Sequence, residues 1–88
     1  MEETLEKLRI QLELLEWPNV YLFKFIIPNQ PEQIAQVTAL FDETSEITFH
    51  PSSNKKYTSV SVKELMLDVD SIIDKYRKAA VIEGIISL

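Results

Sequence analysis

The side chains best suited to binding chemistry in this chain of 88 residues lie in one stretch, HPSSNKKYTSVSV, which spans residues 50–62. Hydroxyl, amide and ammonium groups together can surround a phosphate or a carboxylate, so the stretch is a candidate anion site. Serine and asparagine also form tight turns, and the stretch lacks a glycine-rich cradle and a Gly-Lys-Ser/Thr pattern. We favour a hairpin turn and keep the anion site as the alternative. The candidate ligand-binding residues here are Ser52, Ser53, Asn54, Lys55, Lys56 and Tyr57.

A second candidate site follows the apolar run VYLFKFII, where the chain reads Pro28-Asn29-Gln30-Pro31. The side chains of Asn29 and Gln30 can hydrogen-bond a ligand, with the positive end of a following helix behind them. Pro31 suits the first turn of that helix, because its missing N–H costs nothing there. We favour a plain helix start, and the ligand-binding alternative for Asn29 and Gln30 stays open.

Groups able to perform catalysis or bind metal are scarce. His50 is the only histidine, and the absence of cysteine excludes disulfides, thiolate zinc sites and cysteine nucleophiles. A serine beside His50, either Ser52 or Ser53, has no activating group and no oxyanion hole built from glycines. We therefore expect no enzyme activity, no catalytic residue, no metal and no cofactor.

The charge of the chain and its first residues narrow the partners and the compartment. A net charge of −5 disfavours nucleic acid and anionic membranes, since their phosphates repel an acidic surface. The longest apolar run is far shorter than the roughly 20 residues of a membrane-spanning helix. The start, MEETLEKLR, is acidic and does not resemble a secretory signal, and a chain without cysteine suits a reducing compartment. We expect a cytoplasmic protein that binds neither nucleic acid nor membrane.

The hydrophobic pattern predicts one helix followed by six further elements. The first helix runs from Thr4 to about Glu16, and Pro18 ends it, because proline disfavours helical geometry in the residue before it. One stripe of this helix, at three- and four-residue spacing, consists of Leu5, Leu8, Leu12 and Leu15. Period-two and period-3.6 patterns then predict strand, helix, strand, strand, helix and strand, over residues 20–27, 31–41, 46–50, 59–67, 69–80 and 85–88.

This order predicts an α+β fold, the ferredoxin-like β-α-β-β-α-β sandwich, with an extra N-terminal helix. The antiparallel sheet is expected to have the strand order 4-1-3-2 and two helices on one face. We divide the chain into an N-terminal helical segment, residues 1–18, and a ferredoxin-like domain, residues 19–88.

The chain contains the segments EWPNVYLFKFIIPNQPEQIAQV, PSSNKKYTSVSV and EGIISL. These segments resemble a small bacterial family, the YbeD-like domain of unknown function, and the resemblance runs from about Leu5 to Leu88. It implies a fold similar to the ACT domains, which sense amino acids, and no established activity. The Asp-x-Pro-Gly effector loop of ACT domains is absent at residues 28–31. Lys55 stands where members often have glycine, so we expect Asn54 to be the left-handed turn residue.

The strand predicted over residues 20–27 is apolar on both faces, although two helices cover only one face of such a sheet. We expect the N-terminal helix to cover the second face, with another chain as the alternative. These features favour a non-catalytic interaction or regulatory module that binds a protein partner or its own copy. It would bind through the sheet face or the leucine stripe. The alternative function is an ACT-like sensor of a small anionic metabolite.

Overall fold

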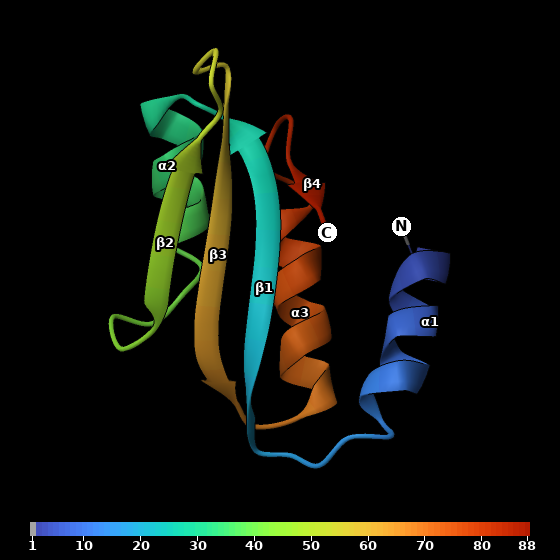
Figure 1. Cartoon of the computed structure of the whole chain (residues 1–88). Helices are drawn as coiled ribbons and strands as arrows, with labels where there is room; N and C mark the ends of the chain where they lie inside the picture. Colours follow the sequence, from blue (N-terminus) through green and yellow to red (C-terminus); the bar gives the residue numbers. More distant parts are fainter. Residues whose placement is uncertain (1) are drawn as a thin grey trace.

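Over residues 2–88, which are the residues that the computed structural model describes, the chain forms three helices and one four-stranded sheet (Figure 1). In chain order the elements are α1 (Glu2–Leu12), β1 (Asn19–Pro28), α2 (Pro31–Thr38), β2 (Glu46–Pro51), β3 (Tyr57–Met66), α3 (Val69–Ala79) and β4 (Ile86–Ser87). The α+β fold and its extra N-terminal helix are therefore as predicted.

The sheet is antiparallel, and its strands lie in the order β2-β3-β1-β4. Counted from the other edge, this is the predicted order 4-1-3-2, so that prediction is confirmed. β1 pairs with β3 along its whole length, from Asn19 opposite Met66 to Pro28 opposite Tyr57. β4 is much shorter and pairs with β1 only through Ser87 and Ile86.

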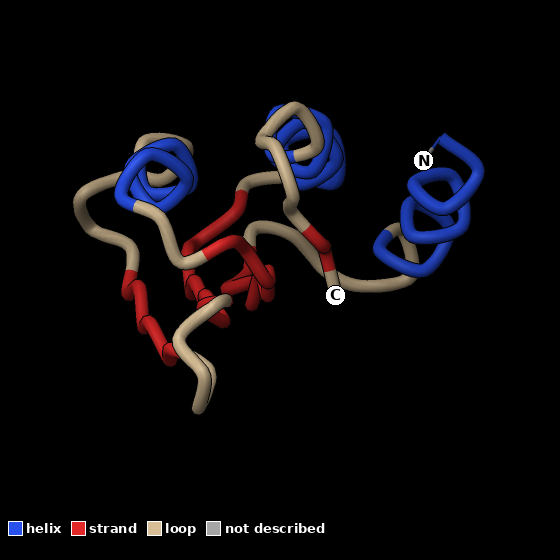
Figure 2. Tube along the Cα trace, turned by 90° about the horizontal axis from the view of Figure 1, so that it is seen from above, coloured by secondary structure: helices blue, strands red, loops and turns tan. Residues whose placement is uncertain are grey.

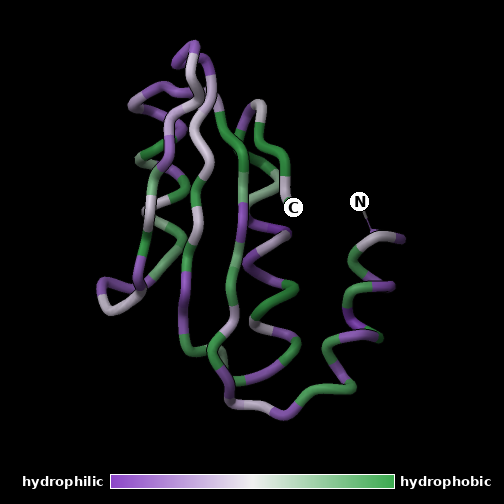
Figure 3. Tube along the Cα trace, viewed as in Figure 1, coloured by the Kyte–Doolittle hydropathy of each residue, from purple (hydrophilic) through white to green (hydrophobic). Residues whose placement is uncertain are grey.

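One face of the sheet carries α2 and α3 (Figure 2). Alternate side chains of β1 point toward these helices, and Phe23, Phe25 and Ile27 are fully buried there. Val60 and Val62 of β3 lie opposite the two phenylalanines and are fully buried as well. The side chains that α3 adds to this core are Ile72, Ile73, Tyr76 and Ala79. Figure 3 shows hydrophobic residues along most of β1, which fits the central place of this strand in the sheet.

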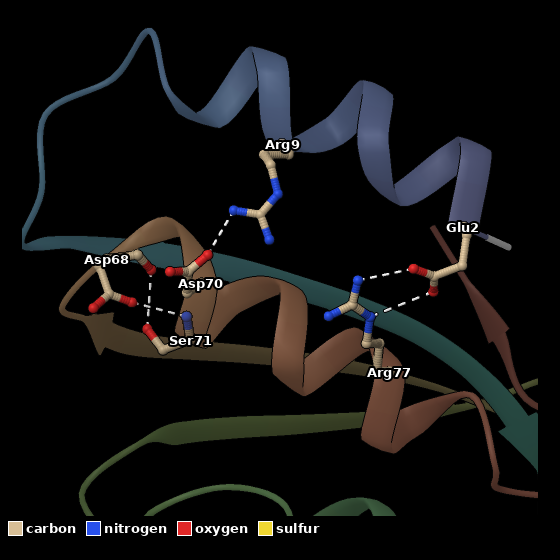
Figure 4. Close-up of polar contacts among 6 residues, drawn as sticks. All are labelled: Glu2, Arg9, Asp68, Asp70, Ser71 and Arg77. Carbon is tan, nitrogen blue, oxygen red and sulfur yellow. Dashed lines mark hydrogen bonds and ion pairs between the residues drawn. The ribbon is translucent and has the colours of Figure 1, made fainter.

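The start of α3 is fixed by Asp68, as predicted. The carboxylate of Asp68 accepts a hydrogen bond from the backbone N–H of Ser71 at 2.8 Å (Figure 4). This bond satisfies one of the N–H groups that the first turn of a helix leaves free. It also favours the charged carboxylate, so it holds the pKa of Asp68 below its ordinary value of 3.8.

α1 begins and ends earlier than predicted, at Glu2 and Leu12, where the pattern predicted Thr4 and about Glu16. The indole N–H of Trp17 donates to the backbone oxygen of Leu12 at 2.8 Å, and the N–H of Leu15 donates to the same oxygen at 3.0 Å. These bonds close the helix with a tight turn. Leu15 therefore lies outside α1 and is exposed.

The prediction that the N-terminal helix covers the second face of the sheet is wrong. α1 lies to the side of the sheet, past β4, and runs beside α3 (Figures 1 and 2). Arg9 pairs with Asp70 at 2.6 Å and Glu2 with Arg77 at 2.8 Å, so two ion pairs join α1 to α3 (Figure 4). Leu5 is buried against the tyrosines of β1 and α3, so the leucine stripe packs on the edge of the core and not on the open face.

Candidate functional site

The stretch between β2 and β3 forms a hairpin turn whose polar groups bond one another. The hydroxyl of Ser52 donates to the side-chain oxygen of Asn54 at 2.8 Å and accepts from the N–H of Tyr57 at 3.2 Å. The same oxygen of Asn54 accepts from the N–H of Lys56 at 3.1 Å. The acceptor groups of Ser52 and Asn54 thus serve the turn itself.

Asn29 joins this hairpin turn to the loop between β1 and α2. Its side-chain amide donates to the backbone oxygen of Lys55 at 3.1 Å, and its side-chain oxygen accepts from the hydroxyl of Thr58 at 2.9 Å. The N–H of Asn29 donates to the backbone oxygen of Lys56 at 2.9 Å. The two candidate ligand-binding loops therefore lie together at one end of the molecule, at the top of Figure 1.

The left-handed residue of the hairpin turn is Lys55, with φ of 57°, and not Asn54 as predicted. The side-chain oxygen of Asn54 accepts from the hydroxyl of Ser52 and from the N–H of Lys56, and these bonds hold Asn54 in the turn. The side-chain amide of Asn29 donates a hydrogen bond to the backbone oxygen of Lys55, which helps to hold Lys55 in the left-handed conformation. Lys55, at the position for which the family resemblance implies glycine, is therefore the residue with the strained conformation.

The remaining candidates of this end of the molecule face solvent. Ser53, Lys55, Lys56 and Tyr57 are exposed, and Gln30 precedes α2 without a side-chain cap bond. His50 lies on the exposed strand β2, and residues 2–88 contain no cluster of three metal-ligating side chains. The groups that this end presents to solvent are therefore mainly ammonium and hydroxyl groups.

The second face of the sheet, here called the open face, carries exposed apolar side chains. Val20, Leu22 and Leu65 lie together on it, because Val20 is opposite Leu65 in the ladder between β1 and β3. Leu22 is 46% exposed and Leu65 is 61% exposed. Ile86 of β4 lies opposite Ile26 and is exposed on the same face. Neither α2, α3 nor α1 covers this face (Figure 2).

Two lysines lie among these apolar side chains. Lys63 is opposite Leu22 on one side and Glu46 on the other, and Lys24 is opposite Ser61. The open face therefore has more basic than acidic side chains on the central strands, although the whole chain carries a net charge of −5. A complementary surface would be apolar and acidic.

Most of the predicted interaction residues of α1 are buried or partly buried within the chain, so they offer little surface to a partner. Leu5 and Leu12 belong to the buried core, and Leu8 is partly buried against it. The exposed apolar residues on the outer side of α1 and its terminal turn are Ile10 and Leu14. Ile10 and Leu14 are four residues apart, a spacing that predicts a second apolar strip. This strip is easily missed in the sequence, because the longer leucine stripe lies on the same helix.

A hydrogen-bonded tyrosine pair lies where α1 meets the body of the molecule. The hydroxyls of Tyr21, on β1, and Tyr76, on α3, are 3.0 Å apart. Burial, and secondarily the bond to Tyr21, raise the pKa of Tyr76 far above its ordinary value. Tyr76 therefore stays neutral at physiological pH, and the pair is held by its hydrogen bond and by the edge-to-face packing of the two rings.

A model of the family described as "Protein of unknown function (DUF493)" matches residues 12–86. The chain belongs to this family. The DUF493 match begins at Leu12, the last residue of α1, so the rest of that helix lies outside the matched region. The YbeD-like resemblance is confirmed by the match, which brings no activity with it. No curated protein and no solved structure matches the chain. Within residues 2–88, no helix has the length and apolar character to cross a membrane.

Proposed function

We propose that this DUF493 domain is a non-catalytic interaction module of a regulatory kind, which works in the cytoplasm and associates with further copies of itself. The observation that carries the proposal is the open face. It presents Val20, Leu22 and Leu65 to solvent beside Lys24 and Lys63. A contiguous apolar patch with polar neighbours is typical of a protein-binding surface. The absence of cysteine supports the cytoplasmic location.

A second copy carries the complementary surface on the outer side of its α1. Ile10 and Leu14 are exposed there, and Glu6 and Glu13 share that side of the helix at spacings of three and four residues, together with one base, Lys7. The apolar residues suit the leucines of the open face, and the two acids suit its lysines. Two open faces placed against each other would instead bring lysines together, so charge favours the contact between helix and sheet.

This contact joins two different surfaces, so a pair of chains still has one open face and one helix free. Association should therefore continue beyond two chains as the concentration rises. Sedimentation velocity over a wide range of protein concentration tests this, with the mass of one chain, 10.2 kDa, as the starting point. A weight-average mass that stays at the value of one chain throughout contradicts the proposal.

Two variants that each lose one surface make the test sharper. Leu22→Glu disrupts the open face and keeps the helix, whereas Leu14→Glu disrupts the helix surface and keeps the open face. Each variant alone is expected to stay monomeric, and an equimolar mixture is expected to form one-to-one dimers and nothing larger. Val81→Glu is the matched control, because Val81 is 84% exposed and belongs to neither surface. Association of either variant by itself would show that another surface is responsible.

A further inference from the structure

A groove with a volume of about 320 Å³ lies between α1 and the body of the molecule. Leu5 and Leu8 form its wall on α1, and Tyr21 and Tyr76 form part of the opposite wall. The groove is separate from the open face and from the hairpin turn. Its volume is near the lower end of the range for small-molecule sites, so it suits a compact ligand.

The charge of the groove is unlike that of the chain. Lys7 is the one charged side chain in its lining, although the chain has 14 acidic and 9 basic residues. Two other grooves of the described residues contain two carboxylates each, Glu46 and Glu64 beside Lys63 in one and Asp42 and Glu43 in the other. Lys7 makes no ion pair within residues 2–88. The lining of the groove therefore has one positively charged side chain and no carboxylate side chain.

The tyrosine pair adds a hydrogen-bond donor to the same groove. In a pair of hydroxyls 3.0 Å apart, one donates to the other, and the accepting hydroxyl keeps its own proton for a third group. Neither hydroxyl bonds another group of residues 2–88. Burial raises the pKa of Tyr76, so Tyr76 keeps its proton over the physiological range, whichever hydroxyl of the pair is the donor.

We propose that this groove binds a small aromatic carboxylate. The aromatic ring lies between Leu8 of α1 and the rings of Tyr21 and Tyr76, since a third ring packs well against an existing edge-to-face pair. The carboxylate accepts hydrogen bonds from Lys7 and from the free tyrosine proton. A ligand in this position touches α1 and the body together, so its binding strengthens the attachment of the helix.

Phenylacetate is a suitable probe, and phenethylamine is its control, because the two share a carbon skeleton and differ in the sign of their charge. A ligand with about ten non-hydrogen atoms is expected to bind in the millimolar range, which NMR titration detects. We expect phenylacetate to shift the backbone amide signals of Lys7, Tyr21 and Tyr76 in a saturable way. Phenethylamine at the same concentration should leave these signals nearly unchanged.

Lys7→Gln is expected to weaken phenylacetate binding about ten-fold, the effect of losing one charge-assisted hydrogen bond. Tyr21→Phe, which removes a hydroxyl without opening a cavity, should weaken it as well. Lys78→Gln is the control, because Lys78 pairs with Asp74 on α3 and does not line the groove. The proposal is overturned by any of three results: no saturable shift, equal binding of phenethylamine, or unchanged binding by Lys7→Gln. Shifts confined to residues 52–57 would overturn it too, in favour of the hairpin turn.

Discussion

Lys55 is the only non-glycine residue within positions 2–88 that has a positive φ, at 57°. A side chain in this region costs roughly 1–2 kcal/mol. Its N–H donates to the backbone oxygen of Ser52 at 2.9 Å, and its oxygen accepts from Asn29, so the hairpin turn holds it in place. Lys55→Gly should remove the strain and add about 0.5–1 kcal/mol to the free energy of unfolding, after the greater unfolded-state entropy of glycine is subtracted. Urea denaturation measures this difference.

The neighbouring lysine provides the control for that measurement. Lys56 has no positive φ, so Lys56→Gly gains nothing from relief of strain and is expected to lower the free energy of unfolding by about 0.5–1 kcal/mol. Both variants remove one positive charge, so charge cannot produce opposite signs. A loss of stability in Lys55→Gly would mean that the side chain of Lys55 stabilises the turn in a way that outweighs its strain.

The sequence predicted the turn itself but placed the left-handed residue one position too early. Serine and asparagine between two alternating runs are enough to predict a hairpin. The choice between Asn54 and Lys55 depends on Asn29, which lies 26 residues before Lys55 and bonds its backbone oxygen. Local preference favours asparagine in this conformation, and a contact between distant loops overrides that preference.

At the scale of elements, α1 is attached to the rest of the fold by few contacts. Leu5 is only 4% exposed, and a buried leucine changed to alanine usually costs about 2–5 kcal/mol. α1 can instead detach as a unit, because one linker joins it to β1. Leu5→Ala is therefore expected to abolish the hydrogen-exchange protection of the α1 amides and to leave that of β1 and β3 nearly unchanged.

Ile10→Ala is the matched control on the same helix, because Ile10 is 59% exposed and lies on the outer side of α1. It should leave the protection of the α1 amides close to that of the unaltered protein, after the change in helix propensity is allowed for. If Leu5→Ala lowers protection equally in α1 and in the sheet, the helix and the sheet unfold together, and α1 is then an integral part of one cooperative unit.

A comparison of β1 with α1 shows that a hydrophobic pattern predicts which side of an element is buried but not which surface it packs against. The run from Val20 to Ile27 is apolar on both faces, which fits the central place of β1 in the sheet, although one of these faces is left uncovered. The leucines of α1 showed correctly that one side of the helix is buried. They did not show which surface this side packs against, because a leucine stripe can pack equally well on the open face and on the edge of the core. In the structure, Arg9 and Arg77 form ion pairs between α1 and α3, and no local pattern relates these residues to their partners.

For the whole molecule, stability should fall in acid because three carboxylates are stabilised in their charged form by hydrogen bonds of the folded state. A hydrogen bond from Arg77 holds the pKa of Glu2 below its ordinary value of 4.5, and this bond joins α1 to α3. Hydrogen bonds from Thr44 hold the pKa of Asp42 below 3.8, in the loop between α2 and β2. Asp68 is held below 3.8 by Ser71 at the start of α3.

A carboxylate whose pKa is lower in the folded state contributes stability above its unfolded pKa and loses it as the pH falls through the folded value. The free energy of unfolding should therefore be steady near neutrality and fall progressively below about pH 4.5, as Glu2, Asp42 and Asp68 become protonated. Urea denaturation at a series of pH values measures the fall. Asp68→Asn keeps a good helix cap but cannot titrate, so its loss of stability in acid should be smaller than that of the unaltered protein. Equal slopes for the two proteins would mean that Asp68 has the same pKa in both states, and that the bond from Ser71 does not favour its charged form.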